Sequence, residues 1–227
     1  MTLTELHEKL LAWATAAERQ DELLRARRAY FDRYGEPHED ERSFEARMNG
    51  MLDYYLYDHR PGGGDYTTLE LFLRDQAPSY GSDELARFRA LGKAVHGLFE
   101  VRKIRPGESI RLRDVFSRED LEVTERRLMA GLEKGDLLEA RLLPHDGRLH
   151  FSGAFLFHPR EVRKLVLAEA KKRRKGAGRG PVDVKGFLAQ LSRMAQKLER
   201  YRNVKVESLY DFRPPAPTPP PGKDSQP

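Results

Sequence analysis

The sequence contains no cysteine in its 227 residues. Disulfide bonds, thiolate zinc sites and cysteine nucleophiles are therefore excluded. It also has no run approaching the roughly 18 apolar residues of a membrane-spanning helix. The N-terminal stretch MTLTELHEKLL is acidic and helical in pattern, unlike the basic start and apolar core of a signal peptide. We therefore predict a cytoplasmic protein with no membrane partner.

Sequence motifs for catalysis are also missing. The three glycines at positions 62–64 are not followed by Gly-Lys-Ser/Thr, so they indicate a turn rather than a phosphate-binding loop. Ser152 lies in FSGAF, which lacks the Gly-x-Ser-x-Gly pattern of a nucleophile elbow. We predict no cofactor and no intrinsic hydrolase or transferase activity.

Two groups of side chains contain residue types that could bind a metal ion. A hard cation needs clustered carboxylates, and a structural zinc site usually needs four ligands. The spacing within each group matches no metal motif, so we predict no metal site and keep a metal-dependent hydrolase only as an alternative. The groups are Asp53, Asp58, His59, Asp65 and Glu70, and the histidines His145, His150 and His158.

Charge is distributed unevenly along the chain. The formal net charge is +5, but residues 160–205 alone contain 15 Lys and Arg against 4 Asp and Glu. The remaining residues carry 26 basic and 32 acidic side chains, a net charge of −6. A local excess of this kind raises the local concentration of polyanions.

The first 97 residues have the 3.6-residue period of helices. Thr2 and Glu5 have capping-box spacing, and an apolar stripe predicts one helix from there to about Tyr34, where Gly35 can end it. Further helices are predicted over about 44–57, in TTLELFLRDQA and in DELARFRALGKAVHGLF. The N-terminal helix needs an apolar partner, either the body of this chain or a second copy in a homodimer.

From Leu98 to Phe157 the period changes to one near 2. Five short runs follow at about ten-residue spacing, separated by turn signals such as Asp146-Gly147. They predict a small five-stranded antiparallel barrel of SH3-like or OB-like type, flanked by helices in an α+β fold. A short helix in RRLMAGLEKGD would lie between the third and fourth strands.

After the barrel, residues 158–210 form a basic helical region. Helices are predicted from Pro159 into the basic run and over about 183–202, with NVKVESLYDF as a final strand. The proline-rich segment 211–227 cannot form a core and is predicted to be an extended, disordered tail. The expected organisation is therefore a helical region (1–97), the barrel (98–157), the basic helical region (158–210) and the tail (211–227).

Several landmarks occur in a recognisable order over residues 50–157. They are MLDYYLYDHR, TTLELFL, LFEVRKI, IRLRDVF, KGDLLEARLL and FSGAFLF. In this order the chain resembles an uncharacterised group of bacterial proteins, some of which carry a C-terminal SEC-C zinc motif. The resemblance implies a shared fold and no established activity, and the zinc motif is absent here because the chain has no cysteine.

The basic run AEAKKRRKGAGRGP carries the functional hypothesis. It predicts a non-enzymatic, nucleic-acid-associated or regulatory factor that binds phosphates without sequence preference. The alternatives are a protein-interaction adaptor that uses the barrel or a helix face, and the hydrolase named above. The predicted contact residues are Lys171, Lys172, Arg173, Arg174, Lys175 and Arg179.

Overall fold

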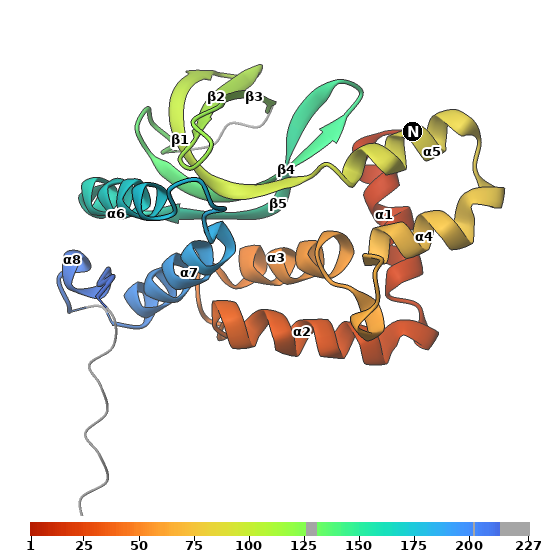
Figure 1. Ribbon diagram of the computed structural model, residues 1–227, viewed down its shortest axis with the longest axis horizontal. Helices are drawn as coiled ribbons and strands as arrows, with labels where there is room; N and C mark the ends of the chain where they lie inside the picture. The colour runs from red at the N-terminus through yellow and green to blue at the C-terminus, as the bar shows by residue number, and fades with distance from the viewer. Residues whose placement is uncertain (126–130, 202, 214–227) are drawn as a thin grey trace, which may run out of the picture.

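The computed structural model describes residues 1–125, 131–201 and 203–213 (Figure 1). Its element order is helices, then five strands, then helices, which confirms the predicted α+β fold. The first group of helices precedes the barrel. It consists of α1 (Leu3–Ala14), α2 (Gln20–Tyr34), α3 (Phe44–Tyr57), α4 (Thr68–Gln76) and α5 (Ser82–Leu91).

The N-terminal segment forms two helices, so the prediction of one long helix was wrong. The capping box is present: the Thr2 hydroxyl accepts from the Glu5 amide, and the Glu5 carboxylate accepts from the Thr2 amide. The helix then breaks at positions 15–19, where the Thr15 hydroxyl donates to the Leu11 carbonyl and the Arg19 guanidinium lies 3.7 Å from the Trp13 ring centroid. The buried residues of α1 all lie in one core, whereas α2 contributes Ala26 to that core and Tyr30 and Tyr34 to a second one.

The apolar stripe of α1 is covered within the chain. Leu6 and Leu10 are fully buried in a core shared with α3, α4 and α5. Leu24, which keeps the apolar spacing of the predicted single helix, is 47% exposed on α2. The body of this chain therefore supplies a partner for α1.

Five strands close into the predicted barrel. The order around the barrel is β1-β2-β3-β5-β4, and every pairing is antiparallel except β3 with β5, which is parallel at Val123↔Leu149. Strands β1 to β3 follow one another, and β4 returns beside β1, which is a Greek-key arrangement. Of the SH3-like and OB-like barrels that the sequence allowed, the OB-like barrel has this topology. The strands are β1 (Val95–Arg105), β2 (Ser109–Asp114), β3 (Asp120–Thr124), β4 (Leu137–His145) and β5 (Arg148–His158).

Alternating residues fill the barrel interior, as the period near 2 predicted. Phe99 and Val101 of β1 meet Ile110 and Leu112 of β2 in a core closed by β3, β4 and β5. The hairpin between β4 and β5 turns at Asp146 and Gly147, which have φ values of 45° and 73°. Two positive φ values in a two-residue loop indicate the predicted tight hairpin turn.

Strand β4 is buried on both faces because helices cover its outer side. Leu137 points into a core with α2, α6 and α7, whereas Leu143 joins the core of α1, α4 and α5. Glu139 and Arg141 lie between these two apolar cores on the same face of the strand. Figure 1 shows α2, α3 and α7 on one side of the barrel, with β2 and β3 on the opposite side.

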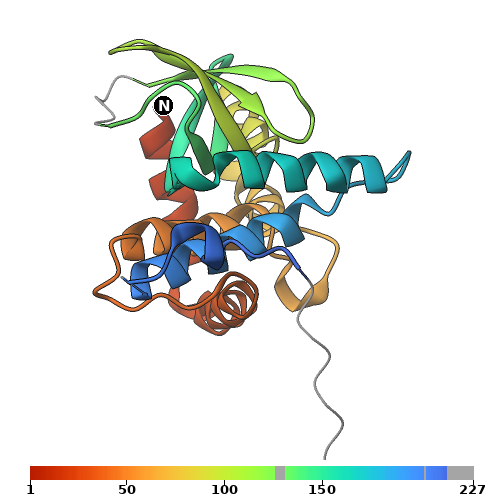
Figure 2. The same ribbon diagram turned by 90° about the vertical axis from the view of Figure 1, so that its left-hand side faces the viewer.

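Within residues 159–201 and 203–213, the α-helices after the barrel are α6 (Arg163–Gly176), α7 (Val184–Arg200) and α8 (Val206–Leu209). Figure 2 shows α6 between the barrel and the layer that contains α2 and α7. Within the described ranges, no helix has the length and apolar character that crossing a membrane would require.

The predicted final strand over residues 203–212 was wrong, because α8 occupies part of it. Val206, Leu209 and Tyr210 have helical spacing, and Tyr210 is 1% exposed. Phe212 then stacks on Phe187, with ring centroids 5.7 Å apart. Of the predicted tail 211–227, residues 214–227 lie outside the described residues, and so do residues 126–130 of the predicted short helix.

Candidate functional site

The predicted basic run is the last part of a helix. Helix α6 continues through Lys175 to Gly176, and its buried residues Val166 and Ala170 join the core with α7 and the barrel. The run Lys171–Lys175 is therefore attached to the body rather than free in a linker.

Two of the six predicted contact residues are used by the fold. Arg173 donates to Glu169 at 3.0 Å and to Gln190 at 2.5 Å, and its guanidinium lies 4.7 Å from the Phe187 ring centroid. Arg174 donates to the Val115 carbonyl at 3.4 Å. These two arginines hold α6 against α7 and the barrel.

The other four predicted residues have exposed side chains: Lys171, Lys172, Lys175 and Arg179. The Lys172 side chain is 80% exposed, although its Nζ forms an ion pair with Glu169 Oε2 at 3.7 Å. Lys164 is also exposed, and the 7- and 4-residue steps from Lys164 to Lys171 and Lys175 place the three on one helical face. We call Lys164, Lys171, Lys172, Lys175 and Arg179 the α6 edge. Sequence reasoning missed Lys164 because it precedes the continuous run.

Much of the remaining positive charge of residues 160–205 is neutralised by acidic residues from earlier segments. Each ion pair joins the C-terminal helices to the body. The pairs are Arg160–Asp136 at 2.6 Å, Arg163–Glu100 at 2.5 Å, Lys185–Asp58 at 2.8 Å and Arg200–Glu41 at 2.6 Å. The charge asymmetry of the sequence thus serves in part to dock these helices.

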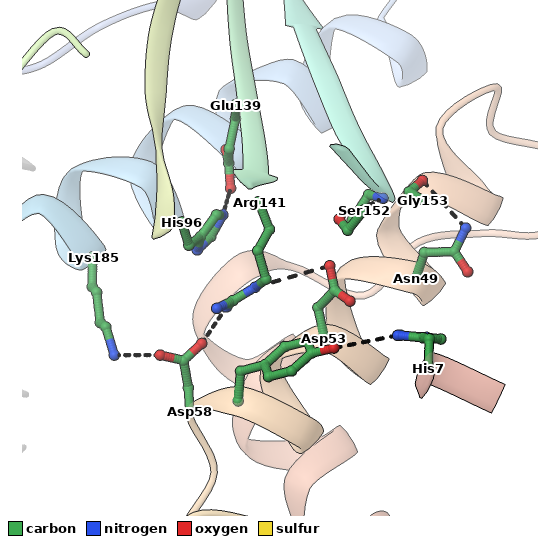
Figure 3. A network of polar contacts seen from close by, with 12 residues as sticks. His7, Asn49, Asp53, Asp58, His96, Glu139, Arg141, Ser152, Gly153 and Lys185 are labelled. Atoms are coloured by element: carbon green, nitrogen blue, oxygen red, sulfur yellow. Dashed lines mark hydrogen bonds and ion pairs between the residues drawn. The ribbon is translucent and has the colours of Figure 1, made fainter. Parts of the chain in front are cut away.

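A second polar cluster lies where the helices meet β4 (Figure 3). Arg141 donates to Asp58 Oδ2, and Asp58 Oδ1 accepts from Lys185 at 2.8 Å. Arg141 Nε also lies 3.9 Å from Asp53 Oδ2. Nearby, His96 is 3.0 Å from Glu139. The cluster links α3, β4 and α7.

The two aspartates of this cluster are in different electrostatic environments. Burial raises the pKa of Asp53, and Arg141 and Ser152 offset only part of that effect. Burial also acts to raise the pKa of Asp58, but Arg141 and Lys185 hold it below its ordinary value. Asp58 is therefore a stable carboxylate, whereas Asp53 is the more easily protonated of the two.

The other three residues considered as metal ligands make separate contacts. His59 is 2.6 Å from Glu22, and Glu70 accepts from the Thr67 amide as the capping box of α4. The backbone carbonyl of Asp65 accepts from Arg60. Among the described residues, no three His, Asp or Glu side chains form a metal-binding group.

The three histidines do not converge either. His145 and His150 have ring centroids 6.1 Å apart beside the β4–β5 hairpin. His158 is buried at the other end of β5, with Nδ1 3.1 Å from the Tyr210 hydroxyl. A shared zinc site is therefore not formed by these residues.

The Arg141 cluster was not predicted, although the sequence contains a signal for it. In LLEARLLP, the two charged residues Glu139 and Arg141 share one face of a strand that is otherwise apolar on both faces. A strand of that pattern is buried on both sides, so its charges must find buried partners. Their partners come from distant segments and cannot be read from local spacing.

Comparison with the curated proteins gave no match, and comparison with the solved structures gave none either. A family model did match, and it covers residues 1–202. That range includes all the helices before the barrel, the barrel itself, the α6 edge and the Arg141 cluster. The chain belongs to the family of unknown function designated DUF7986.

Proposed function

We propose that this protein is a non-enzymatic factor that binds nucleic acid through the α6 edge. The observation that carries the proposal is the exposure of four of the six predicted residues. Three of them lie on α6, which Arg173 and Arg174 fix to the body, and Arg179 follows the helix. Exposed Lys and Arg side chains neutralise phosphates and release counterions. A fixed helix loses less conformational freedom on binding than a flexible linker does.

The binding mode expected here has no sequence preference. Phosphate contacts position a nucleic acid without reading its bases. Base stacking would need exposed aromatic rings near the edge, but Phe187 is fully buried between Phe116 and Phe212. The expected ligand is therefore any single or double strand.

The α6 edge is favoured over the face of the barrel that OB-like proteins use. In such barrels the face of strands 2 and 3 binds oligonucleotides. Here that face pairs Arg113 with Asp120 at 2.7 Å and Arg105 with Glu122 at 2.7 Å. Balanced charge gives little attraction for phosphates, so we assign binding to α6.

The resemblance described above implies a bacterial protein, and a composition without cysteine fits a reducing cytoplasm. We accordingly place this factor in the bacterial cytoplasm.

A competing explanation is that the cations only stabilise the helix. Arg173, Arg174 and Lys175 are in the last turn of α6, where positive charge interacts favourably with the helix dipole. That role predicts a loss of stability on substitution and no binding of nucleic acid. The two explanations therefore differ in a direct binding measurement.

The test compares wild-type protein with a variant in which Lys171, Lys172, Lys175 and Arg179 are changed to Gln. Arg173 and Arg174 are left in place so that α6 stays attached. Fluorescence anisotropy with a labelled single strand and a labelled duplex is followed as salt rises. We expect the variant to bind about tenfold or more weakly at low salt, and its duplex salt slope to fall by about 3–4, near 0.9 for each lost phosphate contact.

A matched control removes four exposed cations from the N-terminal half. Arg28, Arg42, Arg89 and Lys93 are exposed and form no ion pair with another described residue. Changing these four to Gln alters net charge equally but should leave most of the affinity intact. Equal weakening by both variants would contradict a localised site, and absence of binding by wild type would leave the protein-interaction alternative.

A further inference from the structure

A small pocket lies between α2, α3 and the barrel, beside the Arg141 cluster. Its volume is about 50 Å³, and its lining includes Tyr30 and Tyr34 of α2, Tyr54 of α3 and Lys185 of α7. On this measure one water needs about 10–15 Å³, so the pocket holds about three to five non-hydrogen atoms. No residue of the α6 edge lines it, and a ligand here would be independent of the proposed function.

Three tyrosine hydroxyls at this pocket form no hydrogen bond with any described residue. Tyr30 and Tyr34 are 7% and 4% exposed and stack with ring centroids 4.5 Å apart, and the Tyr54 ring centroid lies 5.6 Å from that of Tyr30. The unpartnered side-chain atoms that are sealed from solvent include Asp53 Oδ2 and Arg141 Nε but none of these hydroxyls. The hydroxyls are therefore polar groups that a molecule in the pocket can reach.

Gly50 of α3 gives the Tyr30 hydroxyl room at the wall of the pocket. A Cβ on Gly50 would lie 2.6 Å from the Tyr30 hydroxyl oxygen and 3.8 Å from the Cβ of Ala154. Gly50 and Ala154 both line the pocket, so the hydroxyl end of Tyr30 lies at its wall. A largely buried hydroxyl without a partner is costly, so a group that accepts its hydrogen bond would bind favourably.

The three phenols keep their protons at neutral pH, so each can donate. Burial raises the pKa of Tyr30, of Tyr34 and of Tyr54 above the ordinary value. A hydroxyl bonds an ionised oxygen more strongly than a neutral one. A carboxylate has three non-hydrogen atoms and about four lone-pair sites, which matches the pocket volume and a set of several convergent donors.

The charged side chains that line the pocket favour a single negative charge. They are Arg33, Arg141, Lys185, Asp53 and Asp58, a net charge of +1. Both oxygens of Asp58 are engaged, one by Arg141 and the other by Lys185 (Figure 3). Lys185 retains free donors because an ammonium carries three, and its side chain is 59% exposed. A monoanion would balance this charge and bond Lys185 at the open side of the pocket.

We propose that this pocket binds the carboxylate of a small organic acid. The carboxylate oxygens accept from the hydroxyls of Tyr30, Tyr34 and Tyr54, and Lys185 supplies a further donor. The short carbon chain of the acid packs against the tyrosine rings.

The test uses propionate as the probe and propionamide as its matched control. The two have the same number of non-hydrogen atoms, but the amide is uncharged and has an NH2 donor in place of one acceptor oxygen. Protein NMR shifts of the full chain are followed as each compound is added, with sodium chloride keeping the ionic strength constant. Propionate should bind saturably and at least about tenfold more tightly than propionamide. Equal binding of both, or no saturable binding of propionate, would overturn the proposal.

A matched pair of variants locates the site. Tyr30→Phe removes one hydroxyl and keeps the ring, so it should weaken propionate binding about tenfold while the thermal midpoint without ligand is retained. The control is Tyr55→Phe, because the Tyr55 hydroxyl donates to the Ala14 carbonyl at 2.9 Å in another core. This control should lower the midpoint and leave the affinity for propionate unchanged.

Two results of the variants would contradict the proposal. One is unchanged affinity in Tyr30→Phe, and the other is equal weakening of binding by Tyr30→Phe and Tyr55→Phe. Should Tyr30→Phe lose its thermal midpoint, Tyr54→Phe decides instead by the same comparison, because the Tyr54 hydroxyl also has no partner among the described residues.

Discussion

Arg141 on β4 donates a hydrogen bond to Asp58 at the C-cap of α3, although the two residues are 83 positions apart. Their side chains are 5% and 17% exposed. The pair joins the barrel to the N-terminal helices, and Lys185 extends it to α7. One buried contact therefore connects three parts of the chain that are distant in sequence.

Replacing Arg141 with Ala should destabilise the fold strongly. The change leaves Asp53 and Asp58 in a buried site without their arginine, and breaking a buried ion pair in this way costs about 3–5 kcal/mol. Urea denaturation followed by circular dichroism measures the change. The control is Arg113→Ala, which breaks the exposed pair with Asp120 and should cost at most about 1 kcal/mol. Equal losses of unfolding free energy in the two variants would show that the burial of the Arg141 cluster does not contribute to stability.

Stability should fall as pH drops from about 6.5 towards 4 because of His158. Burial lowers the pKa of His158 from 6.5 to about 4. Between these values the unfolded chain binds a proton that the folded chain does not, so stability is full above pH 6.5 and decreases by up to about 3 kcal/mol at pH 4.

The measurement compares the pH dependence of unfolding in wild type and His158→Gln. The variant should show a shallower dependence between pH 6.5 and 4. Asp53 acts in the opposite direction, since burial raises its pKa, but it is present in both proteins and cancels in the difference. Parallel curves would mean that His158 is protonated as easily in the folded state as in the unfolded one.

Gly35 should tolerate substitution less well than Gly107. Gly35 ends α2 with φ of 90°, and a Cβ there would lie 2.3 Å from Gln196 Oε1. Gly107 has φ of 73° but no atom within 4 Å of a Cβ. Backbone strain of this type costs about 1–3 kcal/mol, and only Gly35→Ala also displaces Gln196 from Glu36 and Glu41.

Equilibrium unfolding of the two alanine variants checks this prediction. Gly35→Ala should be the less stable by at least about 1 kcal/mol, which is the order of a buried hydrogen bond. If the free energy of unfolding falls by the same amount in both variants, the contact of Gly35 with Gln196 does not contribute to stability.

The elements that could be predicted from the sequence depend on neighbours along the chain. The capping box of Thr2 and Glu5 is an interaction over three residues. The barrel strands follow from side chains that alternate between interior and exterior, because that alternation is a local property of extended chain. Where local spacing allowed two structures, as over residues 206–210, the prediction failed: the strand expected there is the helix α8.

The tertiary structure decided which charges are free and which are bound. By itself the sequence determined that the chain has an α+β fold with a small barrel and a strongly basic segment. It could not show that Arg173 contacts Gln190 and Phe187 while Lys171 stays exposed, since those contacts exist only once α6 and α7 pack together. The ion pairs of Arg141 with Asp53 and Asp58 have the same origin. Electrostatic pairing and enclosure depend on distances between segments, and only the packing of the helices on β4 sets those distances.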